Sequence, residues 1–168
     1  MAAFKKFKGR GFEICKGFEI KNPKLPERST ANSAGYDFTV VEDQIIPPSF
    51  VYTLSLGQRT ALEKPTLVPT GIKAYMQPDE ALFLYNRSSN PGKLGLVLAN
   101  SVGVIDADYH SNPDNDGHIM FAFYNMSGSP VKLERGMKIG QGIFQKYLKV
   151  DFDASSGERK GGFGSTSI

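Results

Sequence analysis

The chain of 168 residues has one cysteine, Cys15, and two histidines, His110 and His118. A lone cysteine excludes an internal disulfide and is typical of proteins from a reducing compartment. Three such side chains are also too few to predict a zinc site built within one chain. Nothing in the sequence marks Cys15 as a nucleophile, and we expect a small, buried or half-buried apolar side chain there.

Long apolar runs are missing as well. No run approaches the roughly 20 residues that span a bilayer, and the basic N-terminus lacks the unbroken apolar stretch of a signal peptide. We therefore expect a cytoplasmic protein with no membrane partner. The net charge is only +3, so nucleic-acid binding is not expected, although a mild positive bias would suit a polyphosphate substrate.

Helical periodicity is also scarce, and short runs rich in β-branched and aromatic residues take its place. Turn formers such as Asn-Pro-Gly and SNPDNDG (111–117) separate these runs. The runs that we expect to be strands are FVYTLSL (50–56), TLVPTGIKAYM (66–76), ALFLYN (81–86), LGLVLAN (94–100), HIMFAFYN (118–125) and KIGQGIFQKYL (138–148). This spacing predicts an all-β antiparallel sandwich or barrel, with one weak helical turn in NPGKLGLVLA (90–99).

The length allows one domain with a core and irregular ends. We expect a basic N-terminal extension over 1–22, a single β-domain over 23–153 and a flexible glycine-rich tail over 154–168. The tail has Phe163 and Ile168 as its large apolar residues. Because two such side chains bury little area, we expect the tail to be mobile.

The tetrapeptide GFEI occurs twice near the N-terminus, at 11–14 and at 17–20. A pair six residues apart is too short for a repeat architecture. The repeated tetrapeptide predicts either a β-hairpin or one strand with a turn at Cys15 and Lys16.

Two neighbouring aspartates, Asp106 and Asp108, follow the apolar residues Val104 and Ile105. Residues two apart on a strand face the same side, which would bring both carboxylates to one pocket. An aspartate is ionised at neutral pH and can polarise a water for attack on an electrophile such as phosphorus. The plainer alternative is a pair of aspartates that only shapes a turn.

Arg87, Ser88 and Ser89 offer a guanidinium fork and two hydroxyls, which match phosphate oxygens. The tail segment RKGGFGST (159–166) adds an arginine and a lysine, and its glycines let backbone N–H groups approach an anion. It is not a P-loop, because the Gly-Lys-Ser/Thr ending is missing. Phe163 would stack on a base. Together these features indicate a nucleoside polyphosphate ligand.

Five short clusters occur in order along the chain: SAGYDF (33–38), NRSS (86–89), LANSVGVIDADYHS (98–111), GMKIGQ (136–141) and RKGGFGST (159–166). Each is weak alone, but in this order and at this spacing they resemble the five motifs of the trimeric dUTP diphosphatases (dUTPases). The resemblance covers residues 24–166. It implies a single-domain distorted jelly roll or β-barrel with at most one short helix. It also implies hydrolysis of dUTP to dUMP and pyrophosphate, which keeps uracil out of DNA.

The resemblance gives three of the motifs roles toward phosphate and metal. Asp37 would lie near metal-bound waters. Arg87 would bind the phosphate chain together with Ser88 and Ser89. Gln141 would help to hold the phosphates and the hydration of the metal. The metal would be Mg²⁺, which keeps several of its own waters when it binds a triphosphate.

The third motif would hold the base, the sugar and the attacking water. Asn100 would read the uracil edge. The main chain that would assist it belongs to Gly103, Val104 and Ile105. Asp106 would orient and activate the water, and Tyr109 would pack under the deoxyribose and leave no room for a ribose 2′-hydroxyl.

The fifth motif would close the site as a flexible lid. Arg159 would contact the phosphates, and Phe163 would cover the uracil. The rest of this lid would be Gly164, Ser165 and Thr166. The resemblance also implies a homotrimer in which several subunits assemble each site and the tail of one subunit covers it.

Several residues depart from the family pattern. The second motif usually has proline before its arginine and glycine after its serine, where this chain has Asn86 and Ser89. Gly140 replaces a usual alanine, and Ser111 replaces a frequent glycine before a loop that is longer than usual. No group with an assigned role is lost, but these changes bear on the geometry of the pocket.

Two alternatives remain. The dCTP deaminases, including bifunctional forms that also cleave the triphosphate, share the fold but use a glutamate where this chain has Ala122. Tyr109 also fits the dUTPases rather than the Gly-Trp often found in the deaminases. A non-catalytic binding or regulatory module on the same fold is the other alternative. The joint presence of the motif residues argues against it.

Overall fold

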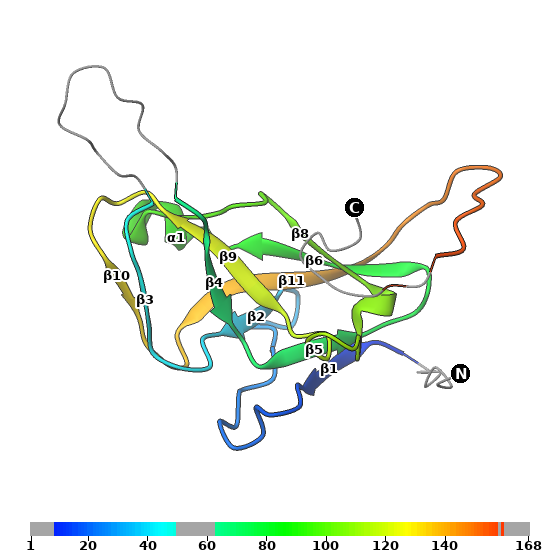
Figure 1. The fold of residues 1–168 in the computed structure, drawn as a ribbon, viewed down its shortest axis with the longest axis horizontal. Helices are drawn as coiled ribbons and strands as arrows, with labels where there is room; N and C mark the ends of the chain where they lie inside the picture. Colours follow the sequence, from blue (N-terminus) through cyan, green and yellow to red (C-terminus); the bar gives the residue numbers. More distant parts are fainter. Residues whose placement is uncertain (1–8, 50–62, 158, 160–168) are drawn as a thin grey trace.

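The computed structural model describes residues 9–49, 63–157 and 159, and strands form most of the regular structure (Figure 1). The largest sheet has the order β2 (Tyr36–Thr39), β11 (Lys138–Lys146), β6 (Glu80–Asn86) and β8 (Gly103–Asp106). A second sheet has the order β4 (Thr66–Pro69), β9 (Met120–Asn125) and β7 (Leu96–Leu98). Two further pairs are β1 (Gly11–Ile14) with β5 (Ile72–Tyr75) and β3 (Gln44–Ile46) with β10 (Val131–Leu133). All these strand pairs are antiparallel.

The core lies between the two larger sheets. Strand β9 alternates half-buried and buried residues, and Phe121 and Phe123 point inward. The Phe121 ring lies 5.6 Å from the ring of Phe38 on β2, centroid to centroid. Burial of one such side chain contributes roughly 1.5–3 kcal/mol, so these aromatic contacts hold the two sheets face to face.

One short α-helix, α1 (Ser89–Leu94), is found among the described residues, and a 3₁₀ turn, η1 (Ala107–Tyr109), follows β8. Helix α1 ends at Gly95, whose φ of 65° is left-handed. A Cβ on Gly95 would also lie 2.8 Å from the backbone nitrogen of Ser127, so only glycine fits there. The expected helical turn therefore covers the first half of 90–99, and β7 takes the second half.

Most predicted strands are observed, with three differences. The run 66–76 divides into β4 and β5 at Gly71, where φ is 71°. The predicted strand over 50–56 lies outside the described residues. Of the two GFEI copies, only the first is a strand, and a turn follows at residues 16–17. The hairpin alternative is wrong because β1 pairs with β5 instead of with the second copy.

Part of the proposed N-terminal extension is built into the fold. Strand β1 pairs residue for residue with β5. The next residue, Cys15, is 1% exposed and donates its N–H to the carbonyl of Gly71 at 2.9 Å. Burial raises the pKa of Cys15 to about 12, so the thiol is protonated and unreactive at neutral pH.

Candidate active site

Three of the five motifs meet at the centre of the four-stranded sheet. Asp37 on β2 is the register partner of Gln141 on β11. On the other side of β11, Gly140 is the partner of Asn86, and Arg87 follows directly. Residues far apart in the sequence come together here because β11 lies between β2 and β6. We call Asp37, Arg87, Ser88, Ser89, Lys138 and Gln141 the β11 cluster.

Asp37 is held as a carboxylate in this cluster. Its Oδ2 lies 2.6 Å from Lys138 Nζ and accepts a hydrogen bond from Ser29 Oγ at 2.6 Å. Burial acts to raise the pKa of Asp37, but the hydrogen bonds from Lys138 and Ser29 and the charges of Lys138 and Arg87 outweigh it and lower the pKa. No sequence pattern pointed to Lys138 or Ser29 as partners of Asp37. A β-bulge between Lys138 and Gly140 breaks the strand alternation, so side-chain spacing alone could not reveal this contact.

The second motif leads from β6 into α1. The Arg87 guanidinium donates to the carbonyl of Lys138 at 3.2 Å. Ser88 is exposed, and its hydroxyl does not cap the helix that begins at Ser89. Asn86, which replaces the usual proline, accepts a hydrogen bond from buried Asn90 at 2.7 Å and donates to the carbonyl of Leu96 at 2.9 Å. This amide pair fixes the start of α1 and explains how the motif tolerates the departure.

Two glycines allow β11 to pack closely at this point. A Cβ on Gly35 would lie 2.2 Å from Gln141 Oε1, so the first motif presses directly on the Gln141 side chain. A Cβ on Gly140 would lie 2.0 Å from a ring carbon of Phe121. The glycine that replaces the usual alanine therefore matches a phenylalanine that occupies the space of the methyl group.

The third motif lies along β8, at the edge of the same sheet. Asn100 and Gly103 contribute to a cavity of about 420 Å³. The other residues that line it are Pro65, Leu84, Leu98, Ala99, Met120, Phe121, Ala122 and Tyr124. A Cβ on Gly103 would lie 3.1 Å from Leu84 Cβ and 3.4 Å from Asn100 Nδ2. A mostly apolar cavity with one amide is the composition expected for a base-sized ligand. Val104 is exposed and Ile105 packs partly on the core.

Asp106 ends β8, and Asp108 lies within η1, so the two do not share one strand face as the sequence analysis assumed. They come together in a different way, through Arg159. The guanidinium pairs with Asp106 and donates from Nε to Asp108 Oδ1 at 2.7 Å. The two carboxylates are about equally exposed, at 49% and 48%.

Tyr109 lies at the end of η1 and is 5% exposed. Its hydroxyl donates to the carbonyl of His118 at 3.2 Å and accepts a hydrogen bond from Asn115 Nδ2 at 2.8 Å. The Arg159 guanidinium lies over its ring, 5.6 Å from the centroid. We call Asn100, Gly103, Asp106, Asp108, Tyr109 and Arg159 the β8 cluster.

The two clusters lie apart along one strand. Asp106 is the register partner of Ala81 on β6, whereas Arg87 follows Asn86 at the other end of β6. The five residue steps from Ala81 to Asn86 span roughly 17 Å of strand. The guanidinium of Arg87 is also held toward β11, on the side away from β8. Within one chain, Arg87 and Asp106 therefore lie at opposite ends of β6.

Four of the predicted site residues, Phe163, Gly164, Ser165 and Thr166, lie outside the described residues. Within the described ranges, no three His, Cys, Asp or Glu side chains gather in a way that could hold a metal ion. In the same ranges, no helix is long and apolar enough to cross a membrane.

Comparison with known proteins decides the family. A model of the dUTPase family matches residues 21–167. The chain belongs to the dUTPase family. It is 44% identical over 159 residues to the deoxyuridine 5'-triphosphate nucleotidohydrolase of Lactococcus lactis subsp. lactis (strain IL1403), a match that covers 94% of this chain and 97% of the relative.

Two solved structures give the same result for the fold of this dUTPase. The crystal structure of the dUTPase from Streptococcus mutans is 46% identical, with a TM-score of 0.71, and the match covers 84% of this chain and 98% of the other. The dUTPase from phage phi11 of S. aureus is 18% identical, with a TM-score of 0.65, over 93% of this chain and 98% of the other. The predicted family, the all-β fold with one short helix and the assignment as a dUTP diphosphatase are therefore confirmed.

Proposed function

We propose that this dUTPase converts dUTP to dUMP and pyrophosphate by attack of a water on the α-phosphorus, with Asp106 as the group that orients the water. The bond from the water oxygen to phosphorus forms, the bond from the α-phosphorus to the bridging oxygen breaks, and the Asp106 carboxylate accepts the proton. The observation that carries this proposal is the position of Asp106 on β8, half-exposed at the opposite end of the strand from the cavity.

The nucleoside would lie along β8. Gly103, which lines the cavity, and Asp106 are three residue steps apart, and this is about 10 Å of strand. That span suits a nucleoside monophosphate, with uracil against Asn100 and the main chain of Gly103, Val104 and Ile105. Tyr109, which follows Asp106 by three residues, would then lie under the deoxyribose.

The β11 cluster would bind the phosphate chain. Arg87 supplies a guanidinium fork, and Ser88 and Ser89 follow it in the chain at the start of α1 and supply two hydroxyls. Gln141 is held next to Asp37 by the β2–β11 register. Positive charge from Arg87 and Lys138 here would stabilise the negative charge that develops on the pyrophosphate leaving group.

The donor set fits a magnesium ion held mainly by the substrate. The described residues offer no protein cage of carboxylates, and Mg²⁺ usually binds through phosphates and its own waters, with one or two carboxylates. The lowered pKa of Asp37 keeps that side chain ionised, so it would contact the waters of the ion. When bound, Mg²⁺ would neutralise and orient the triphosphate.

Separation of the two clusters supports a homotrimer in which each site combines the β11 cluster of one subunit with the β8 cluster of another. A second observation points the same way. Beyond β11 the chain leaves the sheets (Figure 1), and Leu148, Val150 and Phe152 are 98%, 79% and 101% exposed. Large exposed apolar side chains on one short segment are typical of a region that packs on another protein surface, and a second copy of the chain is the proposed surface.

We also propose that the tail over 154–168 closes the site, with Arg159 and Phe163 through Thr166 on the nucleotide. Arg159, the described member of this set, contacts Asp106. A cytoplasmic location is part of the same proposal, and the free, buried thiol of Cys15 is compatible with it. Deamination of dCTP is not proposed, because Ala122 lines the cavity and none of its described lining residues carries a carboxylate.

The first experiment measures pyrophosphate release with Mg²⁺ from dUTP, UTP, dCTP and dTTP. We expect dUTP to turn over far faster than the other three, and comparable turnover of dCTP would contradict the proposal.

In Asp106→Asn we expect kcat to fall about 10²- to 10⁴-fold, because general-base assistance is removed, with nearly unchanged affinity for dUTP.

Asp108→Asn is the matched control. Asp108 contacts the same guanidinium and is as exposed as Asp106, so general loss of charge next to Arg159 should affect both variants. We expect Asp108→Asn to retain most of the activity. Equal losses in the two variants would show that Asp106 has no special role.

A further inference from the structure

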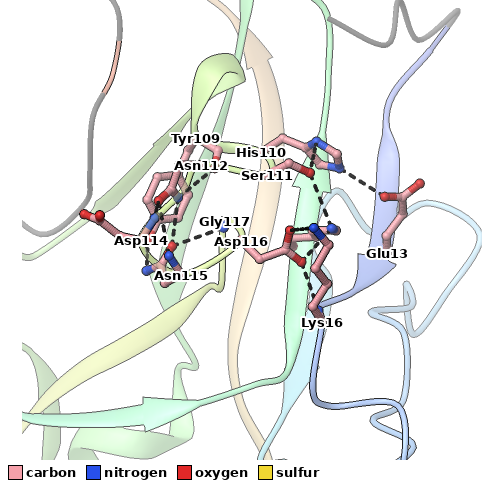
Figure 2. Close-up of polar contacts among 11 residues, drawn as sticks. Glu13, Lys16, Tyr109, His110, Ser111, Asn112, Asp114, Asn115, Asp116 and Gly117 are labelled. Atoms are coloured by element: carbon pink, nitrogen blue, oxygen red, sulfur yellow. Dashed lines mark hydrogen bonds and ion pairs between the residues drawn. The ribbon is translucent and has the colours of Figure 1, made fainter. Parts of the chain in front are cut away.

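The loop over 111–117 forms an ordered platform against Tyr109 (Figure 2). Asn115 Nδ2 donates to the Tyr109 hydroxyl at 2.8 Å, while that hydroxyl donates to the carbonyl of His118 at 3.2 Å. Asn112 Nδ2 donates to the Tyr109 carbonyl at 3.0 Å. Both the phenol group and the backbone of Tyr109 are therefore fixed by hydrogen bonds.

The two asparagines hold each other in place. Asn112 is 6% exposed, and its Nδ2 also donates to Asn115 Oδ1 at 2.8 Å. Asn112 Oδ1 accepts the backbone N–H groups of Asp114 and Asn115 at 3.0 and 3.3 Å. Asn115 Oδ1 also accepts the N–H of Gly117 at 3.1 Å. Because both ends of the Asn115 amide are bonded, its Nδ2 is aimed at the Tyr109 hydroxyl.

An ion pair anchors the loop to the sheets. Asp116 Oδ2 lies 2.7 Å from Lys73 Nζ on β5 and accepts the N–H of Lys16 at 2.9 Å. The Lys73 side chain is only 8% exposed, so water weakens this pair less than it weakens a surface pair. Gly117, with φ of 82°, approaches so closely that a Cβ would lie 2.6 Å from the Tyr109 carbonyl oxygen. The platform therefore cannot shift without moving Tyr109.

We propose that Asn115 is a positioning residue that sets the preference for deoxyribose over ribose. This inference rests on the proposed place of Tyr109 under the sugar. The ribonucleotide differs by one hydroxyl group, and an apolar wall that yields rejects an added hydroxyl only about 10²-fold or less. Tyr109 is held both at its hydroxyl and at its backbone carbonyl, so its ring cannot move aside. Asn115 therefore makes Tyr109 a rigid surface under the sugar.

The test compares kcat/KM for dUTP and for UTP in four variants of the full-length enzyme: Asn115→Ala, Tyr109→Phe, the double variant, and Asp114→Ala. Asp114 is exposed on the same loop, and it joins the network through its backbone instead of its side chain, so it is the matched control. Tyr109→Phe removes the hydroxyl and leaves the loop residues intact, which provides a test even if Asn115→Ala folds poorly.

We expect the dUTP/UTP ratio to fall about tenfold in Asn115→Ala and in Tyr109→Phe, mainly because UTP is used better. The double variant should lose less than the product of the two single effects, since both changes break the hydrogen bond between Asn115 and Tyr109. Asp114→Ala should keep the wild-type ratio. An unchanged ratio in folded Asn115→Ala or Tyr109→Phe, or equal losses for both substrates, would overturn the inference. Absence of dUTP hydrolysis in the wild-type enzyme would instead overturn the proposed function.

Discussion

The β11 cluster and the β8 cluster are held in place by different kinds of interaction. In the first, regular strand pairing brings Asp37, Gln141 and Arg87 together, and charges fix the side chains. In the second, a turn and a loop outside the strands hold Tyr109 through neutral amides and carbonyls, while charge acts between Arg159 and the two aspartates, Asp106 and Asp108. A flexible, highly charged triphosphate needs charge more than exact shape, whereas selection between sugars needs a fixed surface. The two clusters match these different demands.

The largest effect is expected from an experiment that separates the two clusters onto different chains. Arg87→Ala and Asp106→Asn should each be nearly inactive as pure proteins. Trimers assembled from an equal mixture should recover about a quarter of wild-type kcat, because half of the subunits supply each intact residue. The measurement is dUTP turnover after the two proteins are refolded together. No recovery would show that one chain supplies both residues.

A control mixture uses two variants of the β8 cluster, Asp106→Asn and Asn100→Ala. Both residues would come from the same subunit at each site. Mixing these two variants should therefore restore nothing, even though the subunits exchange in the same way.

The free energy of unfolding at mildly acidic pH should distinguish the groups that stabilise the two clusters. His118 Nε2 accepts the N–H of Gly71 at 2.9 Å, and burial lowers the pKa of His118 from 6.5 to about 4. In the unfolded chain the His118 imidazole therefore binds a proton more readily than in the folded protein. The free energy of unfolding falls as the pH falls from 6.5 to about 4. The expected loss at the lower end is about 3 kcal/mol.

His118→Gln keeps an acceptor and should remove this part of the pH dependence, as measured by denaturant unfolding at several pH values. Asp37 in the β11 cluster acts in a different window. Its pKa lies below its ordinary value of 3.8, so its contribution is lost only as the pH falls below about that value. An Asp37→Asn variant should therefore keep the wild-type slope between pH 6.5 and 4. An unchanged slope in His118→Gln would contradict the neutral, buried state of that ring.

A smaller effect is expected at Gly140, behind the β11 cluster. Gly140→Ala places a methyl group against the Phe121 ring and should destabilise the protein by about 1–3 kcal/mol, the usual range for an overpacked core. Phe121→Leu in the same chain should recover part of that loss, and thermal unfolding measures both. Gly92→Ala is the control, because a Cβ there meets nothing within 4 Å. A neutral Gly140→Ala would show that the ring moves freely.

The sequence by itself determined the family and the all-β class, and it predicted the roles of the motif residues. These depend on local patterns: turn formers between short apolar runs, and donors and carboxylates within a few residues of one another. The copy of GFEI at 17–20 shows the limit, because the same four residues form a strand only where β5 offers a partner. The contacts of Lys138, Asn112 and Asn115 also could not be predicted from neighbouring residues. Their partners depend on a bulge and on a folded loop.

Only the tertiary structure decided how the motifs group. The order β2, β11, β6 joins the first, second and fourth motifs, and the antiparallel register of β6 with β8 places Asp106 at the opposite end from Arg87. Motif order along the chain contains no such information, because strand register is set by long-range contacts across the core. The separation of Asp106 from Arg87, and with it the case for the proposed shared sites, comes from that register.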